Sequence, residues 1–520
     1  MLEESKPRNV VPRWRSSTMT TKTSEASFGL ARPAIDYQED LSESNSEFEQ
    51  TPTVPIAAEL MFLAKEAGDA ALTLKAANFL LAKENSVSSN SLISFAKKVS
   101  ANSPLAAPAT TQKTGAIFLK EARQLLALEY RNPILLVDVA RELTSMGHHQ
   151  SALRYIRAAI GMAPNSRFVV RSSARYFLHI GEYDYAHDIL RRAPNIKTDP
   201  WLQASELAVA TVRKRPSLLT KQTFRSLIEA KHIGPERSEL ASAVATMELN
   251  SGSTKNAKQL FNKSLVHPND NSLAQVEWAA ERLKLVVDER VLNTPLSFEA
   301  NSNNAYRRLE VKEAIGHAVL WAQDEPFASR PFDALSYFYS LEDDFENALK
   351  SGEKAIRIED DEKMALHLNR LFSKIQLGQI DDAYPELQRL AQHSDAKFHA
   401  IHLCADYGAL AYATGDSEQG RLFYERAIEM ARKRNDPHSE GQALAFFARA
   451  AIAHKDPNVL AILEQANIRV MKLPSQGAIY VVSRLVDEEK RKALITTAAA
   501  RVQKRVWSWD AASNTLSALE

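Results

Sequence analysis

The spacing of apolar residues along most of the chain predicts amphipathic helices arranged in pairs. In residues 133–164, apolar positions recur every three to four residues, stop at the polar stretch Gly147–Gln150 and then resume. Such spacing places apolar side chains on one face of a helix, and a glycine in a short polar stretch favours a turn. The segment therefore predicts two antiparallel helices joined by a tight turn.

The same pattern returns at a fixed distance along the chain. Residues from Pro133 align with those from Arg167 at an offset of 34 residues, which pairs Ala140 with Ala174, Leu143 with Phe177, Gly147 with Gly181, Ala152 with Ala186, Ile156 with Leu190 and Ala159 with Ala193. Alanine allows two helices to approach closely, and glycine ends a helix in the left-handed conformation at low cost. One such pair cannot bury its own apolar face, so it must stack on further copies.

This order of small residues, glycine, alanine, large apolar residue and closing proline resembles the tetratricopeptide repeat family. About seven imperfect units run from Pro133 to about Val470, with weaker copies starting near residues 240, 330, 364, 404 and 442. Asp343 replaces one turn glycine, and Leu136 and Val170 stand where the family has an early tryptophan. The resemblance implies an all-α fold, a right-handed α-solenoid of stacked antiparallel helix pairs.

Changes of composition divide the chain into six regions. Residues 1–55 are rich in Ser, Thr, Glu and Pro, which predicts a mostly disordered, mildly acidic tail. The alternative is a short partner-binding element around Val10–Trp14. We then expect a helical segment with a linker, a first repeat array, an irregular insertion or inter-array helix, a second array, and C-terminal capping helices with a tail, at residues 56–114, 115–290, 291–328, 329–473 and 474–520.

Charge and cysteine content narrow the classes of function. The chain of 520 residues has 65 Lys and Arg against 64 Asp and Glu, so any electrostatic preference must come from local patches. The single cysteine, Cys404, excludes an intramolecular disulfide and a thiolate zinc cluster. The first residues do not resemble a secretory signal, and no run of about 18 apolar residues occurs. We therefore expect a soluble, cytoplasmic protein that does not enter a membrane.

Sequence motifs for catalysis or cofactor binding are missing. No glycine-rich phosphate loop, HExxH, GxSxG or paired acidic metal motif occurs at a usable spacing. The best metal candidate combines His399, His402 and Cys404, but nothing nearby completes a set of four ligands. We interpret the neighbouring His148 and His149 as residues of a turn. The sequence thus predicts no enzymatic activity, no cofactor and no metal.

Candidate partner-binding residues are basic or aromatic. Under the resemblance, Arg141, Arg171 and Arg175 lie on the concave face of the first two repeats, where they would form a basic groove for an acidic or phosphorylated extended peptide. The alternative is plain surface charge. The family's carboxylate-binding clamp lacks its asparagines here, which argues against capture of a peptide C-terminus. The other candidates are a local basic cluster, Arg213, Lys214 and Arg215, and two aromatic residues, Trp507 and Trp509, that either pack on the last repeat or dock another subunit.

These patterns favour a non-catalytic helical-repeat scaffold or adaptor. It would bind partner proteins through a rigid concave groove and help to assemble a multiprotein complex. The alternative is a regulatory subunit of a larger machine that contacts nucleic acid through its basic patches, which strong salt dependence of binding would reveal. The sequence does not define the partner, the process or the oligomeric state.

Overall fold

A computed structural model describes residues 11–17, 37–66, 69–84, 90–101, 115–128, 131–219, 223, 226–227, 229, 237–358, 363–487 and 515–517. Within these ranges the regular elements are helices, without a strand. The predicted all-α fold is therefore confirmed. None of the helices in the same ranges is both long and apolar enough to cross a membrane.

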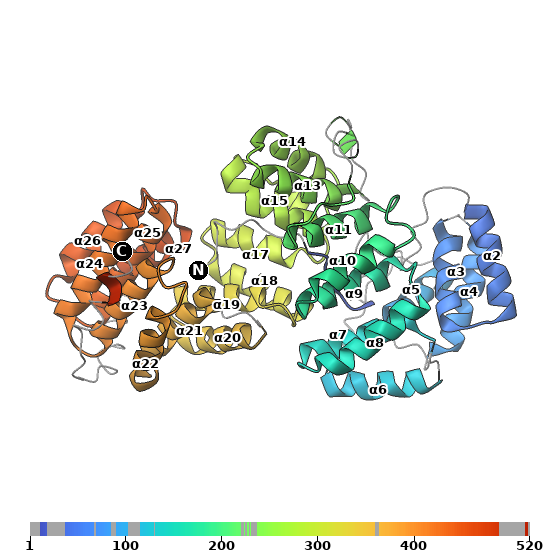
Figure 1. Ribbon diagram of the computed structural model, residues 1–520, viewed down its shortest axis with the longest axis horizontal. Coiled ribbons are helices and arrows are strands. Elements are labelled where there is room, and N and C mark those ends of the chain that lie inside the picture. The colour runs from blue at the N-terminus through green and yellow to red at the C-terminus, as the bar shows by residue number, and fades with distance from the viewer. Residues whose placement is uncertain are drawn as a thin grey trace. The chain divides into compact units, whose positions relative to one another are not determined.

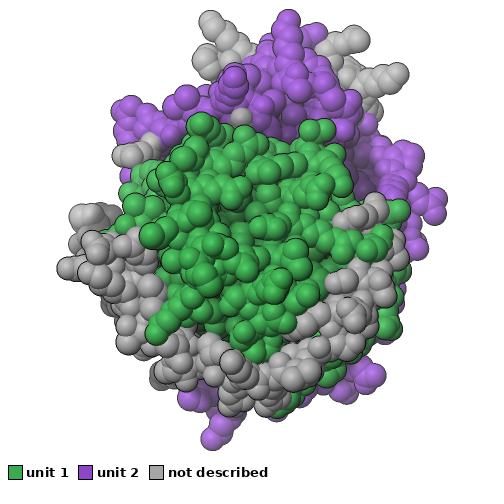
Figure 2. Space-filling view, turned by 90° about the vertical axis from the view of Figure 1, so that its left-hand side faces the viewer, with its two compact units in different colours: residues 1–4, 301–323, 328–520 green, residues 5–300, 324–327 purple. Residues whose placement is uncertain are grey.

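The chain forms two compact units, which Figure 2 shows in purple and green. The N-terminal unit (purple) comprises residues 5–300 with 324–327. Its helices, most of which Figure 1 labels, are α2 (Tyr37–Gln50), α3 (Val54–Glu66), α4 (Ala70–Ala82), α5 (Asn90–Ala101), α6 (Gly115–Leu128), α7 (Pro133–Ser145), α8 (His149–Met162), α9 (Arg167–His179), α10 (Tyr183–Arg192), α11 (Pro200–Val212), α13 (Ser238–Asn250), α14 (Thr254–Ser264), α15 (Asp270–Leu283) and α16 (Glu289–Leu292).

Helix stacking in the N-terminal unit follows the pattern of a solenoid. Helix α7 contacts both its partner α8 and α9, the first helix of the next pair, and α9 in turn contacts α10 and α11. Each pair thereby buries the apolar face that it cannot cover alone. The turns that close α7 and α9 contain Gly147 and Gly181, whose φ angles of 79° and 76° are left-handed, as the repeat pattern predicts.

The C-terminal unit (green) comprises residues 301–323 and 328 onward. The division falls inside α17 (Phe298–Arg307), and α18 (Val311–Asp324) belongs to this unit except for its last residue. The helices that follow are α19 (Arg330–Leu341), α20 (Phe345–Ile358), α21 (Met364–Gln376), α22 (Ile380–Ala391), α23 (Ala400–Ala413), α24 (Ser417–Lys433), α25 (Pro437–Ala453), α26 (Val459–Val470) and α27 (Gln476–Val486).

The array of the C-terminal unit closes on itself. The first helices of its pairs, α19, α21, α23 and α25, contact one another in succession, and α27 contacts both α25 and α19. At the closure, Asp343 accepts hydrogen bonds from Arg449 at 2.9 Å and from Arg484 at 2.7 Å. Asp343 also has the φ of 63° expected at the position of a turn glycine. Its two arginine partners stabilise this residue in a conformation that costs energy for a side chain other than glycine.

Two regions differ from the sequence-based expectation. The tail expected to be disordered over residues 1–55 contains α2 and a buried stretch, residues 11–17. The region 291–328, expected to be irregular or to hold one inter-array helix, contains α16, α17 and α18. The sequence of α17 is largely polar, so the spacing of apolar residues does not predict this helix. Its small polar side chains can nevertheless be buried: Ser302 is buried and donates to the carbonyl of Ala314 at 3.0 Å.

Candidate functional site

Residues 11–17, with the sequence VPRWRSS, are buried against the N-terminal unit's own helices. Six of the seven residues are buried, and residues 11–16 form no regular secondary structure. We call them the docked segment, seen in dark blue in Figure 1. The docking surface comprises residues that contact it, from α7, α9, α15, α17, the last residue of α18 and the stretch after it: Asp138, Arg141, Tyr176, Asp270, Asn271, Glu299, Asp324, Glu325 and Phe327.

Trp14 is the apolar anchor of the docked segment. Its side chain is fully buried, and its ring lies 5.9 Å from Tyr176 in an edge-to-face arrangement and 5.1 Å from Phe327, measured between centroids. Aromatic pairs at such distances stabilise beyond their buried area. The Trp14 carbonyl accepts a hydrogen bond from Arg141 at 3.0 Å, whereas its indole N–H meets no acceptor among the described residues. The ring's burial, rather than its polar atom, therefore holds it in place.

Arg13 is surrounded by three carboxylates. Its guanidinium pairs with Glu299 and Glu325, and its Nε lies 3.3 Å from Asp270. Burial alone would lower the pKa of Arg13, but these carboxylates outweigh burial and raise the pKa. Asp270 and Glu299 stand in the first turns of α15 and α17, where the positive end of the helix dipole stabilises a negative charge.

Arg15 is held by two carboxylates on the other side of Trp14. Its Nε donates to both oxygens of Asp324 at 2.8 and 3.0 Å, and its Nη2 donates to Asp270 at 2.7 Å. Burial works against the charge of Arg15, yet Asp270 and Asp324 raise its pKa well above the ordinary value. Bidentate pairing of this kind matches the planar guanidinium and selects arginine over lysine.

Hydrogen bonds fix the ends of the docked segment. The Ser17 amide donates to Asp138 at 2.8 Å and the Ser17 hydroxyl to the second oxygen of that carboxylate at 2.5 Å. At the other end, the side-chain amide of Asn271 donates to the Val11 carbonyl at 3.2 Å. Burial raises the pKa of Asp138 to about 6, although the Ser17 hydrogen bonds act to lower it. The segment is thus held along its length rather than at one anchor.

The predicted basic groove is wrong for Arg141 and Arg171, because both side chains are buried and paired. Arg141 donates to the carbonyls of Trp14 and Asp324. Arg171 donates to the Trp201 carbonyl at 2.6 Å and to Glu239 at 3.0 Å. Arg141 and Arg171 lie on α7 and α9, the first helices of their pairs, but acceptors distant in sequence pair with both guanidinium groups.

Arg175 is partly buried, and its guanidinium lies 5.1 Å from the centre of the Phe327 ring. It therefore borders the docking surface through an aromatic contact. The charged groups that meet the docked segment's side chains are mostly carboxylates, so the docking surface has the opposite sign from the one predicted.

The other predicted partner-binding residues lie away from the docking surface or outside the described residues. Arg213, at the C-terminal end of α11, forms an ion pair with Asp184 and lies 2.6 Å from a ring nitrogen of His187. Lys214 and Arg215 follow it in an exposed turn. The predictions for Trp507 and Trp509 lie outside the described residues.

Sequence reasoning missed the carboxylates of the docking surface. Asp270, Glu299, Asp324 and Glu325 come from three places in the chain and share no spacing that a repeat pattern would reveal. The one available signal was the alternative of a short partner-binding element around Val10–Trp14, which overlaps the docked segment. The docked segment, residues 11–17, binds its own chain.

The candidate metal residues serve structural roles. His399 occupies the N-cap position of α23 without a capping hydrogen bond from its side chain, and the Cys404 thiol is buried and donates to the Phe423 carbonyl at 3.1 Å. Burial lowers the pKa of His402 to about 3, so its ring is uncharged near neutral pH. In the part of the chain that the structure describes, no group of three or more His, Cys, Asp or Glu side chains could hold a metal ion.

Comparison with known proteins finds only weak structural similarity. No family model matches the chain, and no curated protein sequence matches it. Among solved structures, the APC/C hetero-tetramer Cut9–Hcn1 matches with 14% identity and a TM-score of 0.41, covering 89% of this chain and 93% of that chain. Yeast Tom70 matches with 12% identity and a TM-score of 0.28, covering 77% and 91%, and the human IFIT1 dimer with PPP-AAAA with 12% and 0.29, covering 88% and 98%.

The binding partners of those proteins are not assigned to this chain at this level of similarity. The class of this protein rests on its own structure. Stacked helix pairs with left-handed turns at the repeat glycines make it an α-solenoid of tetratricopeptide-like repeats.

Proposed function

We propose that this protein is a non-catalytic helical-repeat adaptor whose N-terminal unit binds an extended peptide with an Arg-Trp-Arg core. The observation that carries the proposal is the docked segment itself, which buries a tryptophan between two arginines that are each paired with carboxylates. A partner that presents the same chemistry would fit the same surface.

The chemistry of the docking surface sets the specificity. Carboxylates around Arg13 and Arg15 require guanidinium groups on both sides of the aromatic residue, since a lysine cannot satisfy two acceptors in one plane. The contacts at Ser17 favour a small residue with a hydroxyl group. The expected ligand is therefore basic and aromatic, rather than acidic or phosphorylated.

The chain's own segment competes with any partner. A tethered segment has an effective concentration on the order of millimolar, so a partner's segment must bind tightly or arrive when the chain's own segment is released. Because the docking surface belongs to stacked helices, the receptor loses little entropy on binding and the ligand loses most. The N-terminal unit would then exchange one segment for another.

Exchange is testable with a labelled VPRWRSS peptide and the full chain. In the Trp14→Ala variant the chain's own segment is weakened, so we expect the peptide to bind this variant more tightly than the wild-type chain, as measured by fluorescence anisotropy. The peptide VPRARSS is the matched control and should bind neither protein. Equal binding of both peptides to the variant would contradict the proposal.

The alternative of nucleic-acid contact loses two of the basic residues on which it depended, because Arg141 and Arg171 donate to acceptors of the chain itself. Lys214 and Arg215 remain exposed. We expect no binding of single-stranded RNA or duplex DNA at low salt, where phosphate contacts are strongest. Saturable binding under those conditions, lost at physiological salt, would favour the alternative instead.

A further inference from the structure

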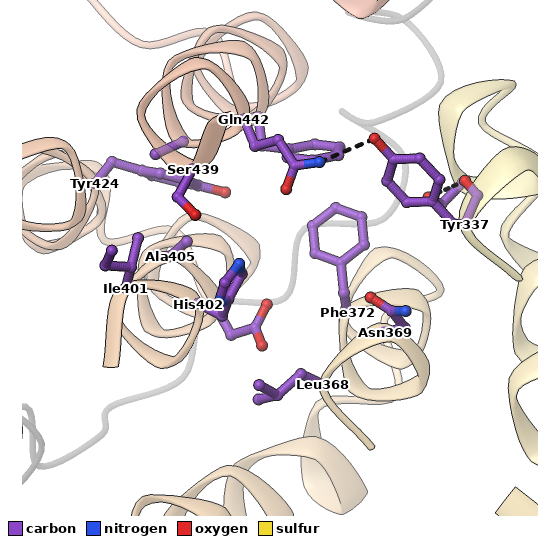
Figure 3. A pocket seen from close by; sticks show the side chains of 14 residues that line it. Tyr337, Leu368, Asn369, Phe372, Ile401, His402, Ala405, Tyr424, Ser439 and Gln442 are labelled. Carbon is purple, nitrogen blue, oxygen red and sulfur yellow. Dashed lines mark hydrogen bonds between the residues drawn. The ribbon is translucent and has the colours of Figure 1, made fainter. Parts of the chain in front are cut away.

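The C-terminal unit has a pocket between the first helices of four successive pairs (Figure 3). Helices α19, α21, α23 and α25 each contribute side chains, and one tyrosine comes from α24. The lining is largely apolar and aromatic, with a few polar groups. Figure 3 labels, among other lining residues, Tyr337, Phe372, His402, Tyr424, Ser439 and Gln442. Apolar walls with a few converging polar groups are typical of a site for a small ligand.

Asp406 of α23 lines this pocket and is only 6% exposed. Its Oδ2 atom accepts no hydrogen bond, and no cationic side chain among the described residues forms an ion pair with it. Burial raises its pKa well above the ordinary value, which favours the protonated, neutral form when the pocket is empty. A buried carboxyl oxygen that accepts no hydrogen bond is costly, and Asp406 forms no ion pair with a described side chain.

The other ionisable side chains that the structure describes near Asp406 do not compensate it. Burial keeps His402 uncharged near neutral pH, and burial raises the pKa of Tyr424, which keeps that phenol neutral as well. Arg449 of α25 is committed elsewhere, since it donates to the Ser340 carbonyl at 2.8 Å and to Asp343. The cation that would complete the site is therefore absent from the described side chains.

The aromatic walls are compatible with a cation. The guanidinium of Arg449 already lies 4.6 Å from the centre of the Phe446 ring and 5.3 Å from that of Phe372. Aromatic faces attract cations most strongly where water is excluded. The side-chain amide of Gln442, another polar group of the lining, donates a hydrogen bond to the Tyr337 hydroxyl at 2.9 Å. Asp406 is thus the one acidic residue among those that line the pocket.

We propose that this pocket binds a primary ammonium group on an apolar body, with Asp406 as its counter-ion. On binding, the ammonium donates a hydrogen bond to Asp406, the carboxyl proton leaves to solvent, and the apolar body packs against the aromatic walls. The ammonium belongs either to a small free amine or to the amino terminus of a peptide. The proposal concerns the C-terminal unit and stands apart from the docking surface of the N-terminal unit.

Isothermal titration calorimetry of the full chain with hexylammonium tests the proposal. We expect saturable binding of hexylammonium and none of its neutral analogue hexanol at the same concentrations. Release of the carboxyl proton on binding would make the measured heat differ between two buffers of different ionisation enthalpy. A peptide with a free amino terminus and its acetylated form distinguish the two sources of the ammonium.

Variants of the lining residues identify the counter-ion. Asp406→Asn keeps the shape of the side chain, and we expect it to weaken ammonium binding roughly tenfold to a hundredfold, the range for hydrogen bonds to charged groups. Asp382→Asn, the same change at an exposed position of α22, is the matched control and should bind as the wild-type chain does. If Asp406→Asn does not fold, Phe372→Leu provides a second measure, with an expected several-fold loss.

Two results would overturn the proposal. The first is wild-type affinity for hexylammonium in Asp406→Asn, which would remove the counter-ion role. The second is the lack of saturable binding by hexylammonium and by the peptide with a free amino terminus, which would remove the ammonium site altogether.

Discussion

Replacing Trp14 with alanine tests whether the ring anchors the docked segment. Its side chain is fully buried against Tyr176 and Phe327, and truncation of a buried tryptophan costs about 3–5 kcal/mol. The loss in global unfolding free energy cannot exceed the free energy of docking, because the segment can leave while the helices stay folded. We therefore expect a small loss in the global unfolding free energy and a large loss in the free energy that holds the docked segment on its surface.

Hydrogen exchange at the Ser17 amide measures the local loss. This amide donates to Asp138 at 2.8 Å and exchanges only when the segment leaves the surface. A local loss of about 3 kcal/mol corresponds to exchange on the order of a hundredfold faster in Trp14→Ala. Trp14→Phe is the control, because it keeps an aromatic ring and removes an indole N–H that meets no acceptor among the described residues, so its effect should be much smaller.

The result that would refute the anchor is specific. If the Ser17 amide exchanges within a factor of about two of the wild-type rate in Trp14→Ala, the ring contributes less than about 0.5 kcal/mol to docking. The ion pairs of Arg13 and Arg15 would then hold the segment by themselves.

Three further predictions concern stability, each measured by urea unfolding. Asp324→Asn leaves a buried arginine without its bidentate partner, and we expect a loss of up to about 3–5 kcal/mol, limited again by the free energy of docking. Gly420→Ala places a Cβ 2.5 Å from the Tyr412 ring and should cost about 1–3 kcal/mol, whereas Gly316→Ala, with open space around it, should stabilise by about 0.5–1 kcal/mol. Burial lowers the pKa of His402 to about 3 in the folded chain, against about 6.5 in the unfolded chain. The neutral ring therefore contributes stability above the unfolded pKa, and this contribution is lost as pH falls, by roughly 2 kcal/mol from pH 7 to pH 5. The His402→Gln variant should lack this pH-dependent part of the unfolding free energy. A pH-independent difference between His402→Gln and the wild-type chain would contradict the last prediction.

The repeat fold could be predicted from the sequence because its determinants are local. Gly147, Gly181 and the matched alanines lie within one helix pair, so a single segment contains the turn and both apolar faces. Even the departure at Asp343 follows the pattern, since that residue adopts the left-handed conformation of the glycine it replaces. The local spacing of residues is enough to predict a fold in which the same contacts recur from one repeat to the next.

The docking surface could not be predicted because its contacts are not local. Arg141 lies on α7, the first helix of its pair, but its partners are the carbonyls of Trp14 and Asp324, 127 residues before it and 183 residues after it. Nothing in the spacing of either region indicates that they meet. The acidic character of the docking surface could therefore not be inferred from the repeat pattern.

The long reach of the docked segment has a consequence for the order of synthesis. Arg13 emerges from the ribosome early, yet its partner Glu325 follows 312 residues later and the partner of Arg15, Asp324, follows 309 residues later. At about 5–20 residues per second, this interval lasts roughly 15–60 seconds. During that time the segment is tethered to a ribosome without its full binding surface. The nascent chain is thus the state in which a chaperone or a neighbouring copy has the best opportunity to capture it.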